Sequence, residues 1–158
     1  MLHPLRRFAA ALGAFMAVFW SQTSAGEQPA PAIAGTVTFF YYEDLEAAAG
    51  FYGELLQLPV TLEEDWVRIY RITPTSSVGL VRQGRGFHAV SDDKPAMLSI
   101  VTDEVDAWYA RLRAAAVPML SELAPPGADR EEGAAPVRGF IAEDPGGYTV
   151  EFFSWAGP

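Results

Sequence analysis

The stretch Glu43-Asp44-Leu45-Glu46-Ala47 opens a run of residues with helical periodicity, and Asp103-Glu104-Val105-Asp106-Ala107 opens a second such run sixty residues later. Both stretches follow an apolar, strand-like run, and both helical runs end at a proline. The apolar runs are residues 36–42 and 96–102, and the prolines are Pro59 and Pro118. The chain therefore contains two copies of one plan, and repeated units usually form a functional site between them.

The spacing of apolar residues predicts one helix and several strands in each unit. Asp44 is suited to cap a helix over residues 44–56, and apolar residues recur in that segment at steps of three and four. These residues are Leu45, Ala48, Phe51, Tyr52 and Leu55. A second helix is predicted over residues 105–115. Strands are predicted at residues 36–42, 60–63, 66–72, 77–82, 96–102, 118–123, 137–142 and 148–153. The order β-α-β-β-β thus occurs twice, which predicts an α+β fold.

Length and composition indicate one folded domain with an N-terminal extension. A chain of 158 residues with 50% hydrophobic residues can bury a single core. Residues 1–25 have the pattern of a signal peptide, and residues 26–34 are expected to form a flexible tether. The apolar run of residues 8–20 is shorter than the roughly 20 residues that cross a bilayer, so no stable membrane span is expected after cleavage. The predicted domain covers residues 35–155, with modules 35–83 and 95–155 and a connector at 84–94.

Charge and cysteine content limit the partners and the compartment. The formal net charge is -9, and removal of residues 1–25 takes away Arg6 and Arg7, leaving 9 basic and 20 acidic residues, a net charge of -11. Such a surface repels phosphate backbones, so we expect no nucleic-acid partner. The sequence has no cysteine, so stability must come from packing even in an oxidising compartment. We expect a periplasmic or secreted protein.

The repeated β-α-β-β-β order resembles the vicinal oxygen chelate superfamily, which includes glyoxalase I, extradiol dioxygenases, fosfomycin resistance enzymes and bleomycin-binding proteins. The resemblance covers residues 36–153 and is most specific at residues 43–47, at Phe51-Tyr52 and at residues 143–151. It implies two modules that enclose a concave pocket, with the ligands of a divalent metal on its floor. It also implies a homodimer, because members of this superfamily commonly assemble as dimers.

The four metal-ligand positions implied by this resemblance fall on Val37, Leu80, Met97 and Glu151. Only Glu151 is a usual ligand, and a transition metal needs about three donors. His88, the only histidine after the signal peptide, lies in the connector. We therefore expect no cofactor, with a divalent metal at Glu151 as the lesser alternative. Carboxylates alone could hold calcium or magnesium, and the candidate clusters are residues 63–65 and 92–93.

Strand alternation predicts which side chains line the pocket together with Val37. The expected ligand-binding residues are Val37, Phe39, Tyr41, Trp66, Tyr70, Leu80, Arg82, Met97, Ser99, Thr149, Glu151 and Phe153. This lining is apolar and aromatic with one acid, as expected for a small organic ligand. The apolar side chains could instead simply fill the interior. Glu151 could pair with Arg68, Arg82 or Arg138, meet a ligand, or act as a general base.

The sequence favours a binding function over an enzymatic one. We expect an exported, glyoxalase-like or bleomycin resistance-like protein that binds a small organic molecule, partly aromatic or cationic, without a catalytic transition metal. The first alternative is a metal-dependent, glyoxalase-like lyase or isomerase that uses Glu151 as its one catalytic candidate. The second is a non-catalytic module that dimerises through its sheet edges.

Overall fold

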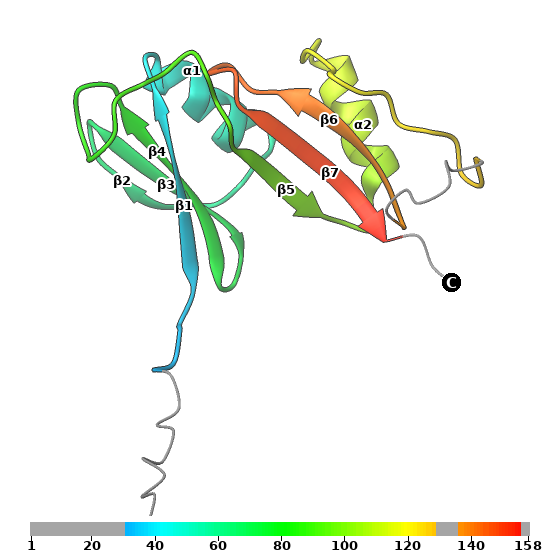
Figure 1. The fold of residues 1–158 in the computed structure, drawn as a ribbon, viewed down its shortest axis with the longest axis horizontal. Helices are drawn as coiled ribbons and strands as arrows, with labels where there is room; N and C mark the ends of the chain where they lie inside the picture. The colour runs from blue at the N-terminus through cyan, green and yellow to red at the C-terminus, as the bar shows by residue number, and fades with distance from the viewer. Residues whose placement is uncertain (1–30, 129–135, 156–158) are drawn as a thin grey trace, which may run out of the picture. The chain divides into compact units, whose positions relative to one another are not determined.

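The strands of the chain form two similar β-sheets, and a helical segment accompanies each sheet (Figure 1). The computed structural model describes residues 31–128 and 136–155. The predicted signal peptide and most of the predicted tether lie outside the described residues. Contacts divide the chain into residues 1–33 and 34–158. In the described part, no helix is long and apolar enough to cross a membrane. The elements are β1 (Thr36–Tyr42), α1 (Leu45–Ala49), η1 (Gly50–Leu55), β2 (Val60–Glu63), β3 (Val67–Thr73), β4 (Ser76–Arg82), β5 (Met97–Val101), α2 (Val105–Ala114), β6 (Val137–Glu143) and β7 (Thr149–Trp155).

The two sheets have matching topologies, which confirms the predicted α+β fold of two modules. The first sheet has the strand order β1-β4-β3-β2 and the second has the order β5-β7-β6. In each module the first strand runs parallel to the last strand, β1 to β4 and β5 to β7. Figure 1 shows α2 lying along β6 and β7, and α1 packs on β4 in the other module. Each sheet therefore has one face covered by its own helix.

The second module departs from the prediction at residues 118–123, which do not form a strand. Only Met119 makes an isolated bridge, to Ala142. Pro118 has no N–H to donate, and the Ser121 hydroxyl accepts the backbone N–H of Ile141 in place of a backbone carbonyl. Because that side chain takes over a ladder hydrogen bond, the regular pairing ends after one bridge.

The helix ends repeat between the modules in detail. The Asp44 carboxylate accepts the N–H of Ala47 at 2.9 Å and caps α1, as predicted. After α1 the chain continues as one π-helical segment, η1. Gln57 and Ala116, which follow the two helical segments, both have a left-handed backbone, and each lies two residues before a proline. A left-handed residue ends a helix by redirecting the chain, so both helices end in the same way.

One continuous hydrophobic core lies between the sheets and their helices. The helical residues Leu45, Ala48, Phe51 and Tyr52 are buried in it, as the predicted helical stripe requires. Even-numbered residues of β1 and β4 face these helices, and aromatic stacking continues the core into the second module. The rings of Phe40 and Tyr148 stack with centroids 4.2 Å apart. Both modules therefore share one core instead of forming two separate ones.

Each module has an equivalent ion pair that joins a strand to the first turn of its own helix. Arg68 donates two hydrogen bonds to Glu46, and Arg138 donates two to Asp106. The hydrogen bonds from these guanidinium groups hold the pKa values of the Glu46 and Asp106 carboxyl groups below their usual range. Both arginines lie on the face of their sheet that carries the helix.

A buried carboxylate joins the modules at the turn between β6 and β7. Asp144 is 4% exposed and accepts the hydroxyl groups of Tyr42 at 2.6 Å and Tyr52 at 3.0 Å. Its second oxygen accepts the N–H groups of Gly146 and Tyr148, both at 2.9 Å. Four hydrogen bonds compensate for removing the carboxylate from water. The turn predicted at residues 143–147 is confirmed, and it anchors the first module as well.

The buried tyrosines predict loss of stability in alkali. Burial, as the largest cause, raises the pKa values of Tyr42 and Tyr52 above the ordinary value near 10. Below that pH both groups are neutral in the folded and unfolded chains, so their contribution is fully present. Above it only the unfolded chain ionises, and the free energy of unfolding should fall by about 2.7 kcal/mol per pH unit for the two groups. Urea titrations at several alkaline pH values measure this slope; a stability independent of pH above 10 would contradict it.

Candidate functional site

Each sheet has a face turned away from its helix, and we call these two surfaces the open faces. On β1 and β4 the open face carries the odd-numbered residues, because the core residues of these strands that pack with α1 and η1 are even-numbered: Phe40, Tyr42, Val78 and Leu80. The pairing of β5 with β7 places Met97 beside Thr149 and Ser99 beside Glu151. The predicted ligand-binding residues that lie on the open faces are Val37, Phe39, Tyr41, Met97, Ser99, Thr149, Glu151 and Phe153.

Three predicted site residues lie on the opposite face, and their assignment to the pocket is wrong. Leu80 is 0% exposed and Tyr70 is 6% exposed, and both pack in the core with the helices. Arg82 donates hydrogen bonds to Glu46 and to the carbonyl oxygen of Asp65. The cause is the register of the sheet: Phe39 pairs with Gly79, whereas Leu80 pairs with Phe40. A register shift of one residue moves a side chain to the other face.

The remaining predicted residues make local contacts. Trp66 precedes β3 and is partly exposed. The Tyr41 hydroxyl accepts the N–H of Phe87, so the connector covers this end of the open face. The Thr149 hydroxyl donates to the carbonyl oxygen of Ala96 at 3.2 Å. Phe153 is nearly buried, and a Cβ atom added at Gly139 would lie 2.7 Å from its Cβ atom.

Gly79 occupies the place in the first module that Glu151 occupies in the second. Glu151 pairs with Ser99, and Gly79 pairs with Phe39, which is the residue sixty positions before Ser99. The ring of Phe39 lies over this glycine: a Cβ atom at Gly79 would be 2.4 and 2.5 Å from two ring atoms. The first module therefore presents an aromatic ring where the second presents a carboxylate.

Among the residues that the structure describes, a hydroxyl group and not an arginine holds Glu151. Its side chain accepts a hydrogen bond from Ser99 at 2.6 Å and is half-buried. Arg68 and Arg138 are bound to helix carboxylates on the other faces of the sheets. The predicted alternative in which Glu151 forms an ion pair with Arg68, Arg82 or Arg138 is therefore wrong, because these arginines pair with Glu46 or Asp106. A carboxylate accepts about four hydrogen bonds, so Glu151 can still accept one from a ligand.

A cavity of about 280 Å³ lies between β1 and β4 of the first module and β5 of the second. Its walls combine hydroxyl groups with aliphatic side chains, and Ser99 links it to Glu151. Most of the other lining residues were not predicted, because alternation along a strand does not reveal which strand edges of two modules meet. The lining residues are Thr36, Thr38, Ile72, Thr73, Ser76, Ser77, Leu98, Ser99, Ile100 and Val101.

The sequence of residues 34–152 matches the family model of the Glyoxalase/Bleomycin resistance protein/Dioxygenase superfamily. The chain belongs to this superfamily. No curated protein matches the sequence significantly. Among solved structures, a lactoylglutathione lyase from Agrobacterium tumefaciens has a TM-score of 0.60 and 22% identity, covering 78% of this chain and 95% of that one.

Two further solved structures of similar fold come from Nocardioides and from Micromonospora sp. ML1. The Nocardioides glyoxalase/bleomycin resistance protein/dioxygenase has a TM-score of 0.60 and 22% identity, covering 82% of this chain and 87% of that one. TioX from Micromonospora sp. ML1 has a TM-score of 0.60 and 17% identity, covering 77% of this chain and 98% of that one. These identities support the fold of the superfamily and no particular activity.

The residues of this superfamily member do not fit a transition metal on the open faces. The positions that correspond to ligands are Val37, Gly79, Met97 and Glu151, and they offer one carboxylate and a thioether. Zinc, iron or manganese sites use about three or more nitrogen, oxygen or sulfur donors. Within residues 31–128 and 136–155, no three His, Cys, Asp or Glu side chains come together as a metal site. In the acidic cluster of residues 63–65, Glu63 is paired with Arg68.

The open faces of this superfamily member expose several large apolar side chains. Phe39 is 46% exposed and Trp155 is 64% exposed, and Val37, Met97 and Val101 are also exposed. The rings of Phe153 and Trp155 are in edge contact with centroids 5.1 Å apart. Apolar side chains that gather on one face usually mark a binding surface, whereas single ones do not.

This exposure predicts binding of a neutral apolar dye. Nile red should bind the native protein, and the double variant Met97→Gln, Val101→Thr should weaken the binding about fivefold because about 1 kcal/mol of apolar contact is lost. The matched control is Val60→Gln, which changes an exposed aliphatic residue on β2, at the far edge of the first sheet. Equal affinities for the double variant and the unchanged protein in fluorescence titrations would contradict the assignment.

Proposed function

We propose that this protein is an exported binding protein that takes up a small organic molecule on the open faces of its two sheets, without a catalytic transition metal. The observation that carries the proposal is the character of those faces. They combine exposed apolar and aromatic side chains with the carboxylate of Glu151, which is held by the hydroxyl of Ser99. Such a surface suits a ligand that is mostly apolar and has one polar end.

The chemistry of the ligand follows from the groups that would contact it. Phe39 and Trp155 offer exposed aromatic rings. Contact of a cation with such a ring contributes about 0.5–2 kcal/mol to the free energy of binding. Glu151 accepts hydrogen bonds and favours a positively charged or N–H-bearing group. The ligand is therefore an aromatic or cationic molecule. Its binding makes and breaks no covalent bond, so the function is sequestration or transport and needs no catalytic acid.

The residues around Glu151 do not supply the groups that the enzymatic alternative needs. A glyoxalase-like lyase or isomerase that uses Glu151 needs further donors around a metal, and the corresponding positions are Val37, Gly79 and Met97. A general base also needs a reactive proton brought within hydrogen-bond reach. The hydroxyl that Glu151 contacts is that of Ser99, and the structure brings no histidine into contact with this pair among the described residues. Binding without catalysis requires none of these groups.

We also propose that the protein is exported and that it forms a homodimer. The basic and apolar pattern of residues 1–25 supports a signal peptide and a periplasmic or secreted location. The sheet edges support a homodimer, because β1 and β5 are edge strands. Edge strands leave hydrogen-bonding groups that another chain can cover. A dimer would also cover part of the exposed apolar surface.

A cationic aromatic probe tests the proposed ligand class. Benzyltrimethylammonium should bind by isothermal titration, and Glu151→Gln should weaken it about tenfold, because the carboxylate that attracts the cation is lost. Glu54→Gln is the control, since Glu54 is an exposed acid on η1, away from the open faces. Equal affinity of the Glu151→Gln variant and the unchanged protein would overturn the assignment of Glu151 to the ligand.

A further inference from the structure

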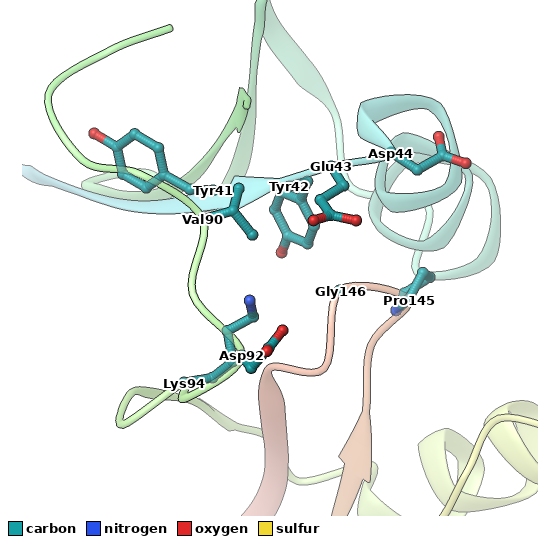
Figure 2. Close-up of a pocket in the computed structure, with 9 residues that line it drawn as sticks. All are labelled: Tyr41, Tyr42, Glu43, Asp44, Val90, Asp92, Lys94, Pro145 and Gly146. Atoms are coloured by element: carbon teal, nitrogen blue, oxygen red, sulfur yellow. The ribbon is translucent and has the colours of Figure 1, made fainter. Parts of the chain in front are cut away.

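A second cavity, of about 220 Å³, lies apart from the one beside Ser99 (Figure 2). Three segments that are far apart in the sequence enclose it: the junction of β1 and α1, the connector and the turn between β6 and β7. It shares only Tyr41 with the predicted ligand-binding residues. The lining residues are Tyr41, Tyr42, Glu43, Asp44, Val90, Asp92, Lys94, Pro145 and Gly146.

Hydrogen bonds and close packing hold the floor of this cavity. Tyr42 is buried, and its hydroxyl is fixed by Asp144 at 2.6 Å. The turn lies directly against that ring, because a Cβ atom at Gly146 would be 2.4 Å from it. The backbone N–H of Tyr41 donates to the Tyr148 hydroxyl at 3.0 Å. A cavity with a fixed shape costs a ligand less conformational ordering than a mobile one.

Charges of both signs enter the cavity from different segments. Figure 2 shows the Glu43 carboxylate and the Lys94 ammonium group directed into it, with the Asp92 carboxylate beside the lysine. No salt bridge within 4.0 Å joins Lys94 to a carboxylate of the described residues. Lys94 instead contacts the carbonyl oxygen of Ser91 and lies 5.1 Å from the centre of the Tyr148 ring.

The Asp44 carboxylate is not directed into the cavity, although Asp44 is one of its lining residues. Its carboxylate is engaged in capping α1, and in Figure 2 it points away from the cavity. The available groups are therefore a carboxylate, Glu43, on one side and an ammonium group, Lys94, on the other, with Asp92 as a second acid. Aromatic and aliphatic walls from Tyr42 and Val90 lie between them.

We propose that this cavity binds a small zwitterion, a free amino acid about the size of alanine. The carboxylate of the ligand would meet Lys94, and its ammonium group would meet Glu43 on the other side of the cavity. The cavity volume of about 220 Å³ has room for a ligand of that size. A simple cation would leave Lys94 unneutralised, and a simple anion would face two carboxylates, so a ligand with both charges matches the site best.

Three probes of nearly equal shape test the proposal. L-alanine carries both charges, L-alaninamide carries only the positive one, and isobutyrate carries only the negative one. In nuclear magnetic resonance titrations of the isotope-labelled protein, L-alanine should shift the backbone amide signals of Glu43, Asp92, Lys94 and Gly146 saturably. Each of the other two probes should bind at least about tenfold more weakly, because one charge contact is missing.

Variants of the charged side chains complete the test. Lys94→Met and Glu43→Gln should each weaken L-alanine about tenfold, and Glu151→Gln should leave it unchanged, which separates this site from the proposed function on the open faces. Absence of saturable shifts with L-alanine would overturn the proposal. So would equal binding of either singly charged probe, or unchanged binding in both the Lys94→Met and Glu43→Gln variants.

Discussion

The alternation of side chains along two pairs of parallel strands controls the rest of this structure. In the pairs β1 with β4 and β5 with β7, register decides which residues meet a helix and which remain on an open face. A slip of one residue would exchange the two sets. Because Phe40, Tyr42 and Leu80 are needed in the core, Val37, Phe39 and Gly79 are left for the open face. The character of the candidate site is thus a consequence of how the core is filled.

Polar contacts reinforce this arrangement on the helix side of both sheets. The two arginine–carboxylate pairs, Arg68 with Glu46 and Arg138 with Asp106, tie each sheet to its own helix. Asp144 then ties the modules together through Tyr42 and Tyr52. Both arginines lie on the helix faces of the sheets, away from Glu151 on the open face. Within residues 31–128 and 136–155, the hydrogen-bond partner of the Glu151 side chain is the Ser99 hydroxyl, which leaves the carboxylate able to accept a hydrogen bond from a ligand.

The sequence predicted the repeated modules, both helices and most strand limits, because hydrophobic periodicity and proline or capping signals are local. It predicted the turn at residues 143–147 but not that Asp144 would bind Tyr42, since that contact joins residues about a hundred positions apart. Leu80 was placed on the wrong face because the first and last strands of the modules lack a marker of register. The cavity beside Lys94 was not predicted because three distant segments form it.

The central claim is that the open faces have lost the donors of a transition metal and bind an organic molecule instead. Native mass spectrometry of the protein purified without chelator tests it most directly, because one spectrum shows metal, bound ligand and number of chains. The account predicts a homodimer that carries an organic adduct and no stoichiometric zinc, nickel, iron or manganese. One such metal ion per chain, lost in the Glu151→Gln variant, would contradict it.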